Sequence, residues 1–173
     1  MWWLLARVAG WDGYPETEWT GAAGNAWDNG GNWSNGVPGS STDVIIPDVV
    51  NDPVISAGIE AECNNLEIAA GARLTIDSDG TRSGSLIVGG TSSGTVTYNR
   101  QMPNDLMYHY ISSPVGSVAL PSSAIFWKWS EPAGDWGDPI TANTAGAGYT
   151  MQAGNSLVSF TGTVITDNVT VSA

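Results

Sequence analysis

The sequence predicts an all-β fold: short β-solenoid coils (β-helix-like) behind a tryptophan-rich N-terminal cap, followed by a packed β-sandwich-like region. Two observations predict it. No stretch of helical length carries apolar side chains at helical spacing without a glycine or a proline. Apolar residues instead recur two positions apart, with turn-forming segments between the pairs. The 22 glycines and 9 prolines among 173 residues agree with many turns and little helix.

The strand signals begin at residue 44. The run from Val44 to Ile46 stops at Pro47, as a strand near a sheet edge does. The segments "AAGA", "DSDGTRSG" and "GGTSSG" then separate further short strands, and all three have turn chemistry. The later apolar pairs are Leu66 and Ile68, Leu74 and Ile76, Leu86 and Val88, and Val96 and Tyr98.

Two architectures are compatible with this pattern. Antiparallel hairpins would make a sandwich or a barrel, whereas a β-solenoid would stack each strand on the strand one coil earlier. The shortness of the strands favours the solenoid, because a coil needs only one inward pair from each strand. Four pairs predict one to two coils of three strands. So small a stack needs a cap.

The cap is predicted in the glycine-rich opening. Trp19, Trp27 and Trp33 are separated by 8 and 6 residues. Both spacings are even numbers, so in an extended chain all three side chains would point to one side. Asn32 and Asn35 flank Trp33 and would tie down the backbone of the turns. The alternative is that the three indoles stack on sugar rings. We expect a cap, since one-sided aromatics between turns usually cover the end of a core.

A second β region is expected over residues 101–173, packed on a capped solenoid or sheet over residues 19–100. Residues 1–18 are expected to be a non-native or leader remnant and poorly ordered. In the second region we expect a strand from Ala124 to Ser130 and a short return at Asp135 and Trp136. Further alternation occurs at Tyr108 and Tyr110, Tyr149 and Met151, Leu157 and Phe160, and Val169 and Val171.

The charge of the chain excludes two classes of partner. One lysine and four arginines stand against 17 acidic residues, for a formal net charge of −12. Binding to nucleic acid or to an anionic membrane surface needs clustered basic residues, and the sequence has none. The apolar run from Trp2 to Ala6 is too short to span a bilayer, so no membrane insertion is expected.

Aromatic residues form a candidate carbohydrate-binding site. Trp127 and Trp129 are two residues apart, on one face of the expected strand, and Trp136 lies across the expected hairpin. With Tyr108 and Tyr110 they would offer flat faces to a polysaccharide or a cell-surface glycan. The alternative is that this face is the core of the second region.

Other candidate sites are weaker. Asp77 and Asp79 in "DSDG" are the candidates for calcium, the one cofactor considered, although a turn explains the segment equally well. His109 is expected to be a packed, structural histidine. Paired carboxylates would allow a glycoside hydrolase, but catalysis is not the favoured hypothesis. Cys63, the single cysteine, is expected to be a small buried apolar residue without a catalytic role.

The segments "WTGAAGNAWDNGGNWSNGVPGSSTDVIIP" (19–47), "AECNNLEIAAGARLTI" (61–76) and "YHYISSPVG" (108–116), with the later "GAGYTMQ" and "VSFTGTV", resemble secreted or surface proteins of the Bacteroidota that use the type IX secretion route. The resemblance runs, with gaps, from about Trp19 to the end. It implies a secreted or cell-surface location. It also implies that the chain is the leading module, or a fragment, of a longer protein.

The functional hypothesis is an extracellular structural or adhesive β module of a larger bacterial surface protein. The first alternative is a carbohydrate-binding module or a polysaccharide-active glycoside hydrolase that uses the aromatic set. The second is a self-associating filament subunit, because an open strand edge can pair with another copy.

Overall fold

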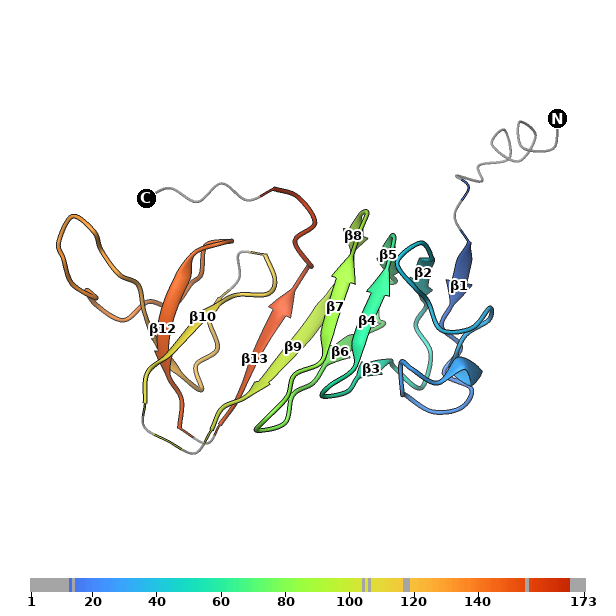
Figure 1. Cartoon of the computed structure of the whole chain (residues 1–173), viewed down its shortest axis with the longest axis horizontal. Helices are drawn as coiled ribbons and strands as arrows, with labels where there is room; N and C mark the ends of the chain where they lie inside the picture. The colour runs from blue at the N-terminus through green and yellow to red at the C-terminus, as the bar shows by residue number, and fades with distance from the viewer. Residues whose placement is uncertain are drawn as a thin grey trace.

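A computed structural model of the 173-residue chain describes residue 13 and residues 15–103, 105, 107–116, 119–154 and 156–168. It confirms the predicted fold class. A three-turn β-solenoid carries a tryptophan cap at its N-terminal end and a second β region at the other end (Figure 1).

The solenoid has three parallel sheets, and each full coil adds one strand to each of them. The first sheet has the order β1 (Glu16–Glu18), β2 (Asp43–Ile46), β5 (Leu66–Ile68) and β8 (Ser92–Ser93). The second stacks β3 (Val54–Ile55), β6 (Leu74–Ile76) and β9 (Val96–Gln101). The third pairs β4 (Glu60–Cys63) with β7 (Ser85–Val88).

The register explains why the apolar pairs recur. Val44 is aligned with Leu66, and Leu74 is aligned with Val96, so equivalent inward positions of successive coils lie one above another. All four of these side chains are buried. Alternation on a two-residue period therefore becomes a continuous apolar column through the coils.

The cap closes the N-terminal end of this column. Trp19, Trp27 and Trp33 are 0%, 1% and 5% exposed, and the ring of Trp33 stands edge to face against both others. Their burial leaves no ring face for a sugar. The 3-10 helix η1 (Gly30–Asn32) ends at Trp33, and the buried Asn32 side chain accepts from the N–H of Ala23 and donates to the oxygen of Ala26.

The outer edge of β1 is covered by the segment that follows Trp33. The N–H of Ser34 donates to the oxygen of Glu18, and the Asn35 side chain donates to the oxygen of Glu16 at 2.9 Å. Thr17 donates from its hydroxyl to the oxygen of Gly36. These bonds satisfy part of an edge that would otherwise be open to pairing.

The second β region continues from the last coil. Strand β13 (Leu157–Gly162) pairs antiparallel with β9 and so ends the parallel stacking of the second sheet. An antiparallel end sheet has the order β10 (His109–Ser112), β12 (Gly148–Gln152) and β11 (Ile125–Trp127). Phe126 of this end sheet packs edge to face on Phe160 of β13, which joins the two regions through one core.

Several details differ from the sequence-based expectation. The solenoid has three turns rather than one to two. The expectation was too low because β1, β3, β4 and β8 lack two large apolar residues spaced two positions apart. β8 lies within "GGTSSG", which was expected to be only a turn. Glu16–Glu18 were placed in the poorly ordered leader, yet they form β1. The rest of the expected leader, apart from Gly13 and Pro15, lies outside the described residues, as do Val169 and Val171.

In the described part of the chain, no helix has the length and apolarity that crossing a membrane requires.

Candidate functional site

The outer face of the end sheet holds the candidate site. Tyr110 and Trp127 are both aligned with Thr150 of the central strand β12. Directly paired residues in a sheet point to the same face, so these three side chains form one row. The neighbouring row, which contains Phe126 and Met151, points the other way and is buried. The sheet therefore turns one aromatic face to the core and another to solvent.

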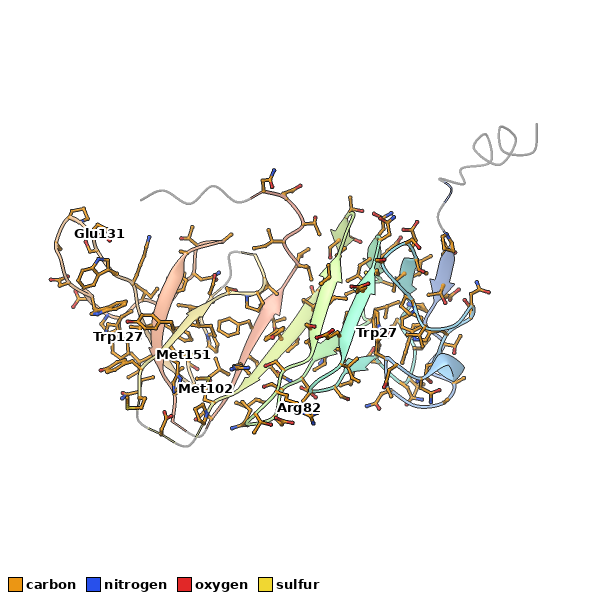
Figure 2. The ribbon with its side chains drawn as sticks, in the orientation of Figure 1. Trp27, Arg82, Met102, Trp127, Glu131 and Met151 are labelled. Carbon is orange, nitrogen blue, oxygen red and sulfur yellow. The ribbon has the colours of Figure 1, made fainter. Side chains whose placement is uncertain are left out.

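Five aromatic side chains gather on this outer face. Tyr108 stands edge to face on Trp127 with ring centroids 5.4 Å apart. Trp136 contacts Tyr110 at 6.1 Å and Trp129 at 5.3 Å. Tyr110 is 83% exposed and Tyr108 is 59% exposed, so the rings are available to a ligand. Figure 2 shows Trp127 at the opposite end of the molecule from Trp27 of the cap.

A hairpin supplies one wall of the site. β11 ends at Trp127 rather than at Ser130, so the expected strand is shorter than predicted. The chain then turns, and Ser130 and Asp135 form an antiparallel bridge with an N–H to oxygen distance of 2.8 Å. This turn returns Trp136 to the side of Trp129. The three tryptophans thus come from a strand, its continuation and a hairpin return, not from one flat strand.

Four of these five aromatic side chains, all except that of Trp129, line a cleft of about 400 Å³, within the usual range for ligand sites. Its lining contains aromatic rings, Thr150 and Gly137, with no ionisable acid or base apart from the tyrosine hydroxyls. Thr150 and Gly137 were not expected at the site from sequence. The alternation of Tyr149 and Met151 was the signal that could have placed Thr150 on the opposite face.

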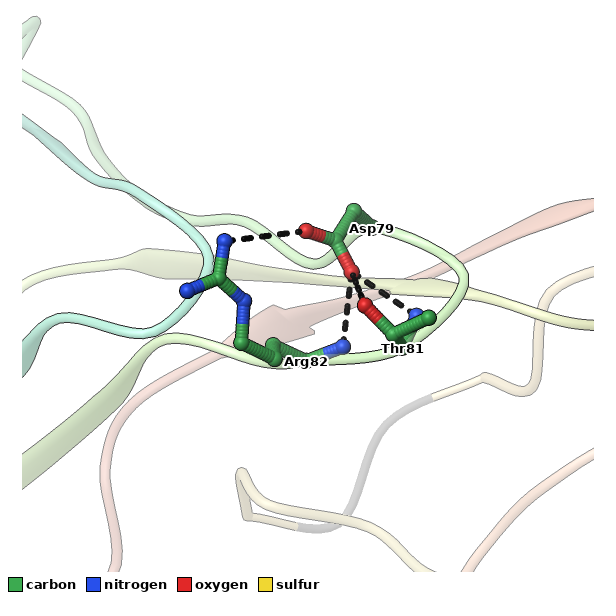
Figure 3. Close-up of polar contacts among 3 residues, drawn as sticks. All are labelled: Asp79, Thr81 and Arg82. Atoms are coloured by element: carbon green, nitrogen blue, oxygen red, sulfur yellow. Dashed lines mark hydrogen bonds and ion pairs between the residues drawn. The ribbon is translucent and has the colours of Figure 1, made fainter.

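The two carboxylates considered as calcium ligands, those of Asp77 and Asp79, already accept hydrogen bonds from other groups of the protein. Asp79 Oδ1 accepts from the N–H and hydroxyl of Thr81 and from the N–H of Arg82, and the Arg82 guanidinium lies 3.7 Å from Oδ2 (Figure 3). These bonds lower the pKa of Asp79 to about 2, and the bond from the Thr81 hydroxyl has the largest effect. Asp77 Oδ1 accepts from the side chain of Asn99. Across the described residues, no group of three or more His, Cys, Asp or Glu side chains is placed to hold a metal ion.

His109 pairs with a carboxylate and not with a serine. Its Nε2 lies 2.9 Å from Asp105 Oδ1, and this contact holds the pKa of Asp105 below its usual value. The hydroxyls of Ser112 and Ser113 donate instead to the backbone oxygens of Ala147 and Val115. His109 is thus half-buried and held by a carboxylate.

Cys63 lies in β4 with its side chain in the core, 1% exposed. The pKa of the thiol is raised to about 12, mainly by burial and to a lesser extent by the negative charge of Asp43. A thiol that stays protonated is a poor nucleophile.

The comparisons with known proteins concern the solenoid part alone. A family model described as a domain of unknown function (DUF8693) is similar to residues 18–88. That range begins just before the tryptophan cap and ends with β7. Searches of the curated proteins and of the solved structures found no match to the chain. The aromatic cleft lies outside the matched range, so its function is argued from its own geometry.

Proposed function

We propose that this chain is an extracellular, adhesive binding module in which the capped solenoid is a rigid stem and the aromatic cleft holds a glycan. One observation carries the proposal: four aromatic side chains from three separate segments line one cleft, and a fifth, that of Trp129, packs beside them on Trp136. Clustered, exposed aromatic surface of this kind is typical of interaction sites.

The chemistry of the cleft supports a sugar ligand. The C–H faces of a pyranose are apolar and pack on indole and phenol rings, while its hydroxyls need a few polar neighbours. The exposed Tyr108 and Tyr110 carry hydroxyls, and Thr150, another hydroxyl-bearing residue, also lines the cleft. An extracellular location rests on the resemblance to Bacteroidota surface proteins and on the composition, which is poor in lysine and rich in glycine.

The proposal is tested by binding to a glycan array and to insoluble cellulose, chitin and β-glucan. We expect retention by the wild-type protein and a loss of affinity of at least about tenfold, or 1.4 kcal/mol, in Trp127→Ala. Trp127 is half-buried, so Tyr110→Ala, at an 83% exposed position, serves as a second variant with little effect on folding.

Val50→Ala is the matched control, since Val50 is fully exposed and lies outside the lining of the cleft. It should bind like the wild type. Binding that is equal in all four proteins would move the site elsewhere, and a complete lack of retention on every glycan would reject the proposed function.

Self-association is a second candidate, favoured by the outer edge of β7. The first and second sheets each have four strands, but the third ends at β7, whose outer edge meets no other strand in the described residues. Ile87 on this strand is 62% exposed. Sedimentation velocity over a range of concentrations tests the idea: a dimer that Ile87→Lys abolishes would support it, and a strict monomer would reject it.

A further inference from the structure

A second hollow of about 480 Å³ adjoins the cleft, and Tyr110 and Trp136 line both spaces. Trp129 lines the second hollow and does not line the first. The two shared rings, which contact each other at 6.1 Å, therefore stand between two neighbouring compartments. A ligand that filled both compartments would pass these rings.

The pleat of the end sheet explains why two compartments lie side by side. The first compartment lies over the row of Tyr110, Thr150 and Trp127, and the next row on the same face pairs Ser112 with Gly148. Rows on one face of a strand are about 7 Å apart, since each residue advances the strand by about 3.4 Å. That step is on the scale of one sugar ring. Ser112 and Gly148 both line the second hollow.

Gly148 keeps the second compartment open. Its backbone does not adopt a positive φ, so conformation alone does not require glycine at this position. A Cβ added there would meet nothing within 4 Å. Within a strand, glycine is normally disfavoured because it has no side chain to pack. The missing side chain therefore leaves free space where a larger residue would fill the floor of the hollow.

The surroundings select against a charged ligand. Neither compartment is lined by an Asp, Glu, Lys, Arg or His side chain. The nearby hairpin carries Lys128 against Glu131, Asp135 and Asp138, all exposed. The charge of this hairpin is thus net negative, in a chain with a formal net charge of −12. A uronic acid or a sulfated sugar would be repelled.

We propose that the two compartments are consecutive subsites for an uncharged oligosaccharide of at least two rings, with Tyr110 and Trp136 shared between the subsites. This inference rests on the proposed function of the cleft. It assigns Trp127 and Tyr108 to the first subsite, and it assigns Trp129 and the open floor at Gly148 to the second.

The test is calorimetric titration with cello-, laminari-, manno- and chito-oligosaccharides of increasing length, from the monosaccharide to the hexasaccharide. For the series that binds, we expect affinity to rise at least about tenfold once a second ring is present. Gly148→Val places a β-branched side chain, which strands accept well, in the second subsite. It should remove the gain from the second ring and leave the affinity for the shortest ligand within about twofold.

Trp129→Ala should act in the same selective way, whereas Trp127→Ala should weaken ligands of every length. Gly148→Ala is the matched control, because one methyl group fits the open space and should preserve most of the gain. Thermal unfolding of each variant checks that the fold is kept. Binding should also be insensitive to salt between about 0.05 and 0.5 M, as expected for an uncharged ligand.

The outcomes separate this inference from the proposed function. A gain with length that survives both Gly148→Val and Trp129→Ala would overturn the second subsite while leaving glycan binding intact. Tighter binding of alginate or hyaluronan oligosaccharides, weakened by salt, would overturn the selection for uncharged ligands. Binding of no oligosaccharide in any series would reject the proposed function and this inference together.

Discussion

The indole Nε1 of Trp33 donates a hydrogen bond of 2.7 Å to the backbone oxygen of Trp27, and the two rings stand edge to face with centroids 4.7 Å apart. Trp19 packs on the other side of Trp33 and donates from Nε1 to the oxygen of Asn51 at 2.6 Å. The cap is therefore both an apolar plug and a set of bonds that links the opening loop to the first full coil.

The two indole N–H groups of Trp33 and Trp27 should contribute differently to stability. The Nε1 of Trp27 is buried and has no hydrogen-bond partner in the described residues. Trp33→Phe removes a bond, whereas Trp27→Phe removes an unsatisfied donor. We expect Trp33→Phe to lower the free energy of unfolding by about 1–3 kcal/mol more than Trp27→Phe. Urea denaturation measures both, and equal losses would contradict this prediction.

A polar ladder at one corner of the solenoid should hold successive coils in register. Asp43 Oδ1 accepts from the side chains of Asn64 and Asn65, and Asn65 Oδ1 in turn accepts from the N–H and hydroxyl of Thr91. Asn65 thus connects three coils, whereas Asn64 makes one of these bonds. Asn65→Ala should cost about 1–2 kcal/mol more than Asn64→Ala. Chemical denaturation of the two variants measures this difference. A larger loss of stability in Asn64→Ala than in Asn65→Ala would contradict the role of the ladder.

Glycine at position 94 is required for two reasons that a pair of variants can separate. Gly94 has φ +83°, and a Cβ there would lie 2.6 Å from the Cβ of Ile68. Gly36 has φ +86° but open space around it. Gly36→Ala should cost about 1–2 kcal/mol from backbone strain alone. Gly94→Ala should cost at least about 1 kcal/mol more, because the coils must also separate. Similar losses in thermal or urea unfolding would show that the close approach is unimportant.

Cys63 should be unreactive in the folded protein. Its pKa, raised to about 12 from an ordinary 9, keeps the thiol protonated at about pH 8, and the side chain is buried. A maleimide should label it only after unfolding. Because the folded pKa is raised, its contribution to stability is fully present below pH 9 and is lost as the pH rises toward 12. Rapid labelling under native conditions would contradict the core position.

The Asp79 turn should titrate at unusually low pH. We expect nuclear magnetic resonance to give a pKa of about 2 in the wild type. Thr81→Ala should raise it toward 3.8, since the Thr81 hydroxyl is the largest cause of the shift, and Thr81→Ser should leave it low. The contribution to stability is present above pH 3.8 and is lost as the pH falls through 2.

The hydrogen bonds of Asp77 and Asp79 also predict how the protein responds to calcium. Because Asp77 and Asp79 already accept from Asn99, Thr81 and Arg82, we expect neither added calcium nor a chelator to change the melting temperature. A rise of several degrees with calcium, lost in Asp79→Asn, would instead establish the site.

Much of the fold could be predicted because strand alternation is a local property. Leu66 and Ile68, or Leu74 and Ile76, mark their strands through residue type and spacing alone. Strands such as Val54–Ile55 and Ser92–Ser93 have too few residues to show a period. They exist because a neighbouring coil pairs with them, which no local pattern reports.

The candidate site, too, could be predicted in its residue types but not in its arrangement. Residue type selected Tyr108, Tyr110, Trp127, Trp129 and Trp136, but it left open whether they form a core or a surface. The pairing of both Tyr110 and Trp127 with Thr150 places them on one face of the end sheet. The burial of Phe126 and Met151 on the opposite face makes this face the outer one.

The sequence by itself determined the all-β class, the tryptophan cap and the aromatic set, because turn residues, two-residue alternation and ring-bearing side chains are local properties. Only the tertiary structure decided the number of coils, the strand order and the two adjoining hollows at Gly148 and Thr150. These depend on which distant strands pair, and register across a sheet is set by long-range packing that a single strand does not encode.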